Sequence, residues 1–298
     1  MTTMDSTPVA AKRPVVENRK RRDWTNGLLN VWGVLMYLFL FAPIFVIIAF
    51  SFNTGRLLTS WNGFGFEGYE AFFNNPNAQR AVWVSVQAGF MAALIATVLG
   101  TMAGIALARR PGKWVGIFLA LVAVVLVTPE IVDAVGLLPW YVRLGEDWNL
   151  VAFSNGLVRL VISHAIFATA VVALIVRARL AGLDEALEES AADLYAPPFR
   201  RFTQITLPLV MPAVLAGALL SFTLSLDNTI ISSFVSTPGY TPWPVYVFSS
   251  LRSALRPEIA SVSTLMFALT LVAIGLVALV LRRGGDSSGD IAKTMTGT

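Results

Sequence analysis

The sequence predicts an all-α protein that crosses a membrane six times. Hydrophobic residues make up 56% of the 298 positions and charged residues only 13%, and the mean hydropathy is +0.69. Soluble globular domains are far less apolar, and about a quarter of their residues are charged. Six apolar segments are long enough for a helix of about 20 residues to cross the hydrocarbon of a bilayer. Basic residues are concentrated in alternate connections between these segments.

The six segments are predicted to be helices, because a lipid-exposed strand would leave its backbone groups without partners. They are residues 28–52, 81–108, 114–138, 157–176, 207–234 and 259–281. Together they form a membrane domain, 25–283, between a basic tail at 1–24 and a Gly-, Ser- and Thr-rich tail at 284–298 that we expect to be disordered. A basic run at 19–22 directly precedes the first segment and no small-residue cleavage site follows it, so this segment is expected to remain as an anchor.

Lys and Arg predict the orientation of the domain. Six of the 22 basic residues lie on one side of the predicted membrane: Arg56, Arg80, Arg143, Arg159, Arg252 and Arg256. The others lie in the tails and in the connections after the second and fourth segments. Because cytoplasmic loops carry the excess of basic residues, both termini and the connection at 180–208 are predicted to be cytoplasmic. The net charge of +4 thus belongs to tails and short loops, and nucleic-acid binding is not expected.

Residue counts exclude several kinds of chemistry. The chain has no Cys and one His, which rules out disulfides and thiolate sites and leaves no expected metal site. A phosphate-binding loop of the G-x-x-x-x-G-K-[ST] type is absent, so the chain is not expected to bind ATP or to be an enzyme.

The connection at 180–208 is predicted to contain a short acidic helix at 184–194. Asp184 can serve as its N-cap, acidic residues favour its N-terminal end, and Pro197 and Pro198 are expected to stop it. Apolar residues recur at helical spacing: Leu183, Ala186, Leu187, Ala191 and Leu194. One face of the helix therefore needs a partner, unless the loop is simply solvated.

Five residues of this connection, Glu189, Ala191, Ile205, Leu207 and Pro208, fit the pattern Glu-Ala-Ala, three residues, Gly, nine residues, Ile-x-Leu-Pro. The pattern resembles the EAA loop of ABC importer permeases. Ser190 replaces the first Ala and Tyr195 replaces the Gly, and because Tyr is strained at positive φ, the turn after the helix is expected to differ. The resemblance implies that contacts with an ATPase subunit are made by Glu188, Glu189, Ala191, Leu194, Tyr195, Ile205, Leu207 and Pro208.

The third segment carries acids next to a break. Pro129 is expected to kink the helix, which a membrane tolerates only where protein or water covers the freed backbone. Glu130 follows it directly, and Asp133 lies three residues further on. Ionisable side chains at such depth usually face a cavity, so a role in a pathway is one interpretation. The other is that both acids lie near the outer interface and are solvated.

The fifth segment is expected to be one helix with a polar face formed by Ser221, Ser225, Asn228 and Ser232. The hydroxyl groups are interpreted as contacts between helices. Asp227 lies beside this face, and we expect it to line a path because an isolated carboxylate in lipid is costly. His164 in the fourth segment is interpreted as a core residue with satisfied hydrogen bonds, with a proton relay as the alternative.

The outer connection at 53–80 is rich in aromatic residues, including Trp61, which are interpreted as interfacial residues or as a docking surface for a partner. Residues 221–239 and 256–264 resemble the permease subunit of spermidine/putrescine-type ABC importers, and the likeness extends over about 25–283. The family commonly has two adjacent acids where this chain has Asp227 and Asn228.

This resemblance implies the type I fold of ABC importer permeases, in a prokaryotic plasma membrane and surrounded by lipid. It implies as partners a second permease subunit in a heterodimer, two cytoplasmic ATPase subunits that bind ATP and Mg, and an extracytoplasmic solute-binding protein. The implied polyamine path contains Asp227, Asn228, Glu130, Asp133, Ser225 and Trp61, with Trp140, Tyr141 and Phe222 as walls.

Two other functions remain open at this point. The chain could serve as an ABC permease for another organic solute. It could also be an ion-coupled secondary transporter, in which Glu130, Asp133, Asp227 and His164 would be ion or proton sites, although such a protein has no need of the loop pattern around Glu189.

Overall fold

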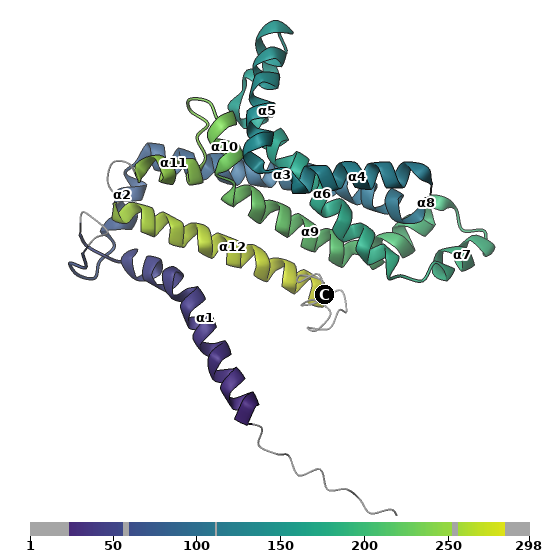
Figure 1. Cartoon of the computed structure of the whole chain (residues 1–298), viewed down its shortest axis with the longest axis horizontal. Helices are drawn as coiled ribbons and strands as arrows, with labels where there is room; N and C mark the ends of the chain where they lie inside the picture. Colours follow the sequence, from purple (N-terminus) through teal and green to yellow (C-terminus); the bar gives the residue numbers. More distant parts are fainter. Residues whose placement is uncertain (1–23, 56–59, 111, 252–255, 284–298) are drawn as a thin grey trace, which may run out of the picture. The chain divides into compact units, whose positions relative to one another are not determined.

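The computed structural model describes residues 24–55, 60–110, 112–251 and 256–283 (Figure 1). The two predicted tails, 1–24 and 284–298, lie outside these residues, apart from residue 24. The chain divides into two compact units, residues 1–46 and 47–298. In its described part, the first unit is the portion of helix α1 (Trp24–Phe50) up to Val46.

The predicted all-α class is confirmed, because all regular elements of the described residues are helical and extended pairing is limited to an isolated bridge between Asn53 and Phe64. The α-helices after α1 are α2 (Glu67–Phe73), α3 (Pro76–Arg109), α4 (Lys113–Val127), α5 (Glu130–Val142), α6 (Gly156–Ala181), α7 (Ala186–Asp193), α8 (Pro198–Arg201), α9 (Leu207–Asp227), α10 (Ile230–Val235), α11 (Trp243–Ser250) and α12 (Pro257–Arg283). Short π-helical or 3-10 turns occur at Arg143–Asp147, Val151–Ser154 and Phe202–Thr206.

By length and composition, five or six apolar stretches of the described residues fit the six predicted spans. Five stretches of the described residues are long and apolar enough to cross a membrane: Gly27–Phe50, Pro76–Arg109, Gly156–Ala181, Pro198–Asp227 and Glu258–Val280. The helical pair Lys113–Val127 and Glu130–Asp147 qualifies as a sixth span if it is counted as one, and it is bent by 102°. The predicted interruption of the third segment at Pro129 is therefore confirmed.

The prediction of one continuous helix over 207–234 is wrong. Helix α9 ends at Asp227, and α10 begins three residues later, after Asn228 has taken an extended conformation with ψ 105°. The side chain of Asn228 accepts a hydrogen bond from the backbone N–H of Ser232, which replaces one of the backbone bonds lost at the break. At its other end the apolar stretch is longer than predicted and begins at Pro198.

Helices α3, α6 and α9 form the centre of the second unit and lie side by side, and α12 runs along α9 (Figure 1). Small residues permit the close approach of α3 and α6. A Cβ atom added at Gly100 would lie 2.6 Å from Cβ of Val172, and one added at Gly104 would lie 2.7 Å from the carbonyl oxygen of Ala173. The two helices are therefore in backbone-level contact at this crossing.

Three buried clusters stabilise this arrangement, and two of them hold further elements on the centre. One cluster joins α5 and α10 to α3 and α6 through residues such as Tyr141 and Ile231. A second packs Trp243 of α11 and Phe72 of α2 against α3 and α12. The third lies near the connection at 180–208 and includes Leu180 and Val210. The first cluster brings the two broken helical pairs, α4/α5 and α9/α10, together.

Candidate functional site

The two helical pairs are broken for different reasons, and the break in the first pair has a simple local cause. Thr128 precedes a proline and is extended, with ψ 129°, and Pro129 has no N–H to continue the hydrogen bonding of α4. Helix α5 then starts at Glu130 in a new direction. In the other pair the extended residue is Asn228, and no proline follows it. Its own side chain holds the extended conformation by accepting a hydrogen bond from the N–H of Ser232.

Glu130 and Asn228 connect the two breaks. The Asn228 Nδ2 donates to Glu130 Oε2 at 3.4 Å, across 98 residues of sequence. The Asn228 Oδ1 accepts from the backbone N–H of Ser232 at 3.3 Å, so the amide must direct its NH₂ group toward Glu130. A carboxylate beside a helix break is thus held by a neutral amide donor.

His164 of α6 bridges the break between α9 and α10. Its Nδ1 lies 2.6 Å from the hydroxyl of Ser225 on α9, and its Nε2 lies 3.0 Å from the hydroxyl of Ser232 on α10. All three side chains are buried. His164 is therefore a core residue with both ring nitrogens bonded, in agreement with the interpretation of the sequence, and it fixes both halves of the broken helix to α6.

The three predicted path acids lie on three separate cavities rather than on one. Glu130 lines a cavity of about 30 Å³ together with Asn228, Ser225 and His164. Asp133 lines a second cavity of about 250 Å³. Asp227 lines a third, of about 480 Å³. The described residues contain no group of three or more His, Asp or Glu side chains that could hold a metal ion.

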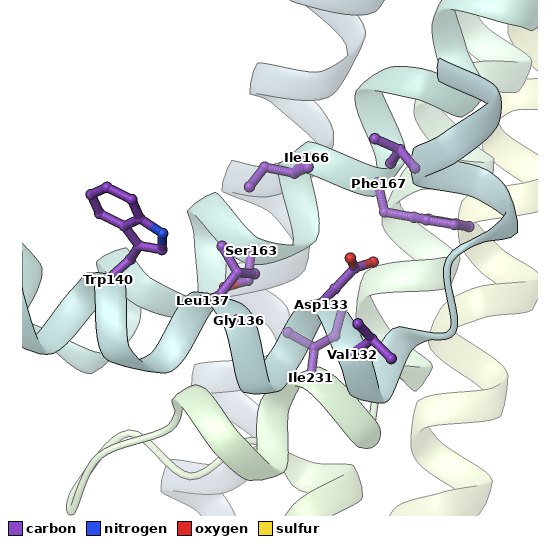
Figure 2. A pocket seen from close by; sticks show the side chains of 10 residues that line it. Val132, Asp133, Gly136, Leu137, Trp140, Ser163, Ile166, Phe167 and Ile231 are labelled. Carbon is purple, nitrogen blue, oxygen red and sulfur yellow. The ribbon is translucent and has the colours of Figure 1, made fainter. Parts of the chain in front are cut away.

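The Asp133 cavity lies between α5, α6 and the end of α4. Figure 2 shows Asp133 pointing into it toward Phe167, with Ile231 beside Asp133 and Trp140 at the far end. Apart from Asp133 and the hydroxyl of Ser163, most of the lining side chains are apolar. The cavity thus presents one carboxylate within an apolar wall.

The Asp227 cavity is larger, and its lining combines one carboxylate with apolar side chains and with the hydroxyl groups of Thr223, Thr229, Ser263 and Thr270. Its aromatic walls are Trp243 and Phe248 of α11 and Phe267 of α12, none of which the sequence pattern identified. Asp227 is exposed and is the last residue of α9, where the helix dipole disfavours a negative charge. Its position therefore does not serve the stability of α9.

The predicted wall residues are divided between cavities and core. Trp140 lines the Asp133 cavity, as described. The hydroxyl of Tyr141 is hydrogen-bonded to Ser163 at 2.8 Å in the buried cluster, so Tyr141 does not form a cavity wall. Phe222 lies against Gly89 of α3. Trp61 is placed edge-on to Phe50, with ring centroids 5.9 Å apart, and does not line the three cavities.

At the other end of the bundle, Glu188 anchors the 180–208 connection. Arg109, in the last turn of α3, forms ion pairs with Glu185 at 2.8 Å and Glu188 at 3.1 Å. Glu188 also accepts a hydrogen bond from Thr206 at 3.0 Å. Sequence reasoning missed Arg109 and Thr206 as partners, although a basic residue at the end of one span opposite an acidic loop was a usable signal.

Tyr195 corrects the expected change in the turn after the acidic helix. Despite its side chain, Tyr195 adopts the left-handed conformation, with φ 58°. Its N–H donates to the carbonyl of Ala192 at 2.9 Å, and the N–H of Ala196 donates to that of Ala191 at 3.0 Å. These are the two hydrogen bonds of a Schellman motif, in which Gly is usual. The turn therefore has the same conformation as one with Gly at this position. The left-handed conformation of Tyr195 costs about 1–2 kcal/mol.

This turn also shows that Pro197 and Pro198 have a different role from the predicted one. Helix α7 ends at Asp193 through this motif, before Pro197 is reached. Pro198 is instead the first residue of α8, a position that suits its fixed φ and missing N–H. The two prolines therefore do not stop the acidic helix as expected.

The remaining predicted coupling residues differ in their exposure to solvent. Leu194 and Tyr195 are 82% and 95% exposed, and Glu189 is also exposed. Ala191 and Ile205 are half-buried, and Leu207 and Pro208 form the start of α9. Exposed apolar side chains thus remain on the predicted apolar stripe, on a loop tied to the bundle by Glu188.

Comparison with known proteins relates this fold to a transport family. Residues 100–284 match the family described as "Binding-protein-dependent transport system inner membrane component". The chain is 38% identical over 249 residues to the putrescine transport system permease protein PotI of Escherichia coli (strain K12), which covers 83% of this chain and 86% of PotI. It is 35% identical over 256 residues to the spermidine/putrescine transport system permease protein PotC of Haemophilus influenzae, covering 86% and 97%.

A solved structure shares the fold. A chain of a bacterial alginate ABC transporter, in complex with its alginate pentasaccharide-bound periplasmic protein, superposes with a TM-score of 0.69 at 16% identity, covering 88% of this chain and 95% of that one. The predicted permease fold and the resemblance to permeases of spermidine/putrescine importers are thus confirmed. With its apolar helices, the protein is a multi-pass membrane protein. The chain belongs to the family of binding-protein-dependent transport system inner membrane components.

Proposed function

We propose that the chain is a permease subunit of an ATP-driven importer of polyamines such as putrescine or spermidine. Relatives that are named as permeases of putrescine and spermidine/putrescine systems support the substrate class. The observation that carries the proposal is the meeting of two broken helical pairs at Glu130 and Asn228. Irregular backbone within the depth of a membrane is tolerated where it lines a cavity or is covered by protein, and acids there mark solute pathways.

The cavities offer what an amine requires. A polyamine has ammonium groups separated by methylene stems, so its path should alternate carboxylates with aromatic or apolar walls. The Asp227 cavity combines one carboxylate with Trp243, Phe248 and Phe267, and the Asp133 cavity combines one with Trp140 and Phe167. The proposed path therefore includes Asp227, Asn228, Glu130, Asp133 and Ser225, while Trp61 is assigned to it by the sequence alone.

Coupling to ATP would occur through the 180–208 connection. Leu194, Tyr195 and Glu189 are exposed there, on a loop held to α3 and to the segment preceding α9 by Glu188. A rigid loop with exposed apolar side chains can transmit the movement of a docked subunit. The proposed partners are two cytoplasmic ATPase subunits, which bind ATP and Mg and hydrolyse ATP, a second permease subunit and an extracytoplasmic solute-binding protein. The complex would lie in a prokaryotic plasma membrane with both termini of this chain in the cytoplasm.

The substrate assignment is tested with the complete complex in proteoliposomes that contain ATP, with its binding protein outside. Replacing Asp227 with Asn removes the carboxylate of the largest of these three cavities at almost constant side-chain volume. We expect putrescine uptake to fall about tenfold or more, the loss of about 1.4 kcal/mol or more of interaction with the passing cation. Asp147→Asn, at an exposed position in the turn after α5, is the matched control.

Normal uptake by the Asp227 variant would remove this acid from the path. Import of a neutral or anionic solute by the native complex, with no import of amines, would refute the polyamine assignment and leave the permease role intact.

Coupling is tested by replacing Glu189 with Lys. This charge reversal on the exposed side of α7 should leave the protein in the membrane but prevent ATP-driven uptake and reduce copurification of the ATPase. Glu146→Lys, an equivalent reversal in the Arg143–Asp147 turn, serves as the control. Normal uptake and ATPase association in the Glu189 variant would show that this face of the loop is not the docking site.

A further inference from the structure

Arg159, near the start of α6, is a buried cation without a counter-ion. It is 8% exposed, and its Nε–H donates to the backbone carbonyl of Phe153 in the connection between α5 and α6. In the part of the chain that the structure describes, the ion pairs are those of Arg109, and the Arg159 side chain makes no second hydrogen bond. A guanidinium group has five N–H donors, so four of them have no partner among these residues.

A charge in this position calls for a partner. Taking an ion out of water is costly, and a single carbonyl group compensates for less of that cost than a carboxylate does. The two Nη groups of Arg159 are not fully enclosed, so a group from outside the chain can reach them. A carboxylate suits them best, because its two oxygens accept parallel hydrogen bonds from the planar guanidinium group.

The guanidinium group is held in place by its neighbours. The ring of Phe153 is stacked on that of Tyr141 of α5, with centroids 6.1 Å apart. The Ser163 hydroxyl donates to the backbone carbonyl of Arg159 at 2.8 Å and lies 2.8 Å from the hydroxyl of Tyr141. A side chain that is already fixed loses little conformational freedom on binding, which favours recognition of a partner.

The connection at 143–155, to which Phe153 belongs, is exposed over most of its length. Residues 146–152 are all exposed, and they combine the acids Glu146 and Asp147 with large apolar side chains such as Trp148. Figure 1 shows that α5, which leads into this connection, projects from the bundle of α3, α6 and α9. A buried Arg beside an exposed surface of mixed polarity is typical of protein–protein contacts, in which Arg and Trp often contribute most of the binding energy.

We propose that Arg159 anchors a docking surface for the extracytoplasmic solute-binding protein and pairs with a carboxylate of that protein. The inference rests on the proposed function, in which this partner delivers the amine. Arg159 lies on the side of the membrane that the basic residues predict to be outside. A connection that leads away from the bundle meets a partner in the aqueous phase, whereas a second permease subunit would pack against the spans. The charge also complements a protein that binds cations, because such a protein presents carboxylates around its ligand.

Three substitutions of Arg159 test the charge and the geometry of the contact. The complete complex is reconstituted in proteoliposomes with ATP, and putrescine uptake is measured over a range of concentrations of the loaded binding protein. Arg159→Gln should raise the half-saturating concentration about tenfold at an unchanged maximal rate, because the ion pair is lost. Arg159→Lys should raise it about threefold, because it keeps the charge but not the paired donors. Arg159→Glu should exceed Arg159→Gln, because two carboxylates repel each other.

Arg143→Gln, at an exposed position of the same connection, is the matched control. It should change the half-saturating concentration by less than about twofold, because exposed charges contribute little to a contact. Cosedimentation of the binding protein with the proteoliposomes, without putrescine, measures the contact independently of transport.

The docking surface is wrong if Arg159→Gln reaches half-saturation at the wild-type concentration, or if it lowers only the maximal rate, which would show a purely structural role. Equal effects of Arg159→Gln and Arg159→Glu would exclude a carboxylate as the partner. Loss of the second permease subunit from the purified Arg159→Gln complex would assign the contact to that subunit instead. A wild-type complex that imports no amine would overturn the proposed function, whereas cosedimentation would still decide whether Arg159 contributes to docking.

Discussion

Replacing Gly100 or Gly104 with Ala should destabilise the bundle, although Ala is the better helix former. A Cβ at Gly100 would lie 2.6 Å from Cβ of Val172 and 2.9 Å from the carbonyl oxygen of Thr169. A Cβ at Gly104 would lie 2.7 Å from the Ala173 carbonyl oxygen. Backbone atoms cannot rotate away, so α3 and α6 must separate.

The magnitude follows from two opposing effects. Overpacking of a core costs about 1–3 kcal/mol, and a clash with backbone belongs at the upper end of this range. Exchanging Gly for Ala within a helix returns about 0.5–1 kcal/mol. The expected net loss is therefore about 2 kcal/mol for either substitution.

Thermal unfolding of the purified protein in detergent measures this loss, and two other glycines provide matched controls. Apart from the neighbouring residues and backbone of its own helix, no atom lies within 4 Å of a Cβ added at Gly116 of α4 or Gly136 of α5. Ala at these positions should raise the unfolding temperature slightly, because only the helix preference of Ala remains. If Gly100→Ala unfolds at or above the temperature of Gly116→Ala, the close approach of α3 and α6 does not limit stability.

Three further predictions concern the 180–208 connection and its orientation. Tyr195→Gly should relieve about 1 kcal/mol of strain and slow hydrogen exchange of the two Schellman amides about fivefold; faster exchange would show that the ring stabilises the turn. Arg109→Gln should speed exchange in α7 modestly, because the pairs with Glu185 and Glu188 are partly exposed and are together worth about 1 kcal/mol; unchanged exchange would assign the anchoring to other contacts. Since the chain has no native Cys, a single Cys at Asp193 should resist an impermeant thiol reagent in intact cells; its labelling would reverse the predicted orientation.

The membrane spans could be predicted because the apolar residues that mark them are adjacent in the sequence. Of the two helix breaks, the one at Pro129 could be predicted and the one at Asn228 could not. Apolar length alone identifies a crossing helix, and Pro129 marks the first break by its missing N–H. The second break contains neither Pro nor Gly. Asn228 and its neighbours fit a polar face of a continuous helix equally well, and only the contacts with Glu130 and Ser232 favour an extended residue there.

In the candidate site too, features set by neighbouring residues could be predicted from the sequence, whereas contacts between distant residues could not. The left-handed turn at Tyr195 was mispredicted, because residue preference was weighed without the two hydrogen bonds that hold the turn. The pairing of Arg109 with Glu188 spans 79 residues of sequence, which no spacing rule covers. The close contact at Gly100 and Gly104, by contrast, had a visible signal in two glycines four residues apart.

The contacts around the second break explain how the protein can interrupt a membrane helix there and still keep one acid available. A broken helix leaves backbone groups unpaired, and an unpaired group is costly in an apolar medium. His164 compensates by fixing both halves through Ser225 and Ser232, which commits the strong hydrogen bonds of the region to structure. Among the residues that the structure describes, the side chain of Glu130 has one long hydrogen bond, from a neutral amide. Because that weak contact contributes little to the stability of the broken helix, the carboxylate can exchange its hydrogen-bond partner without loss of the fold.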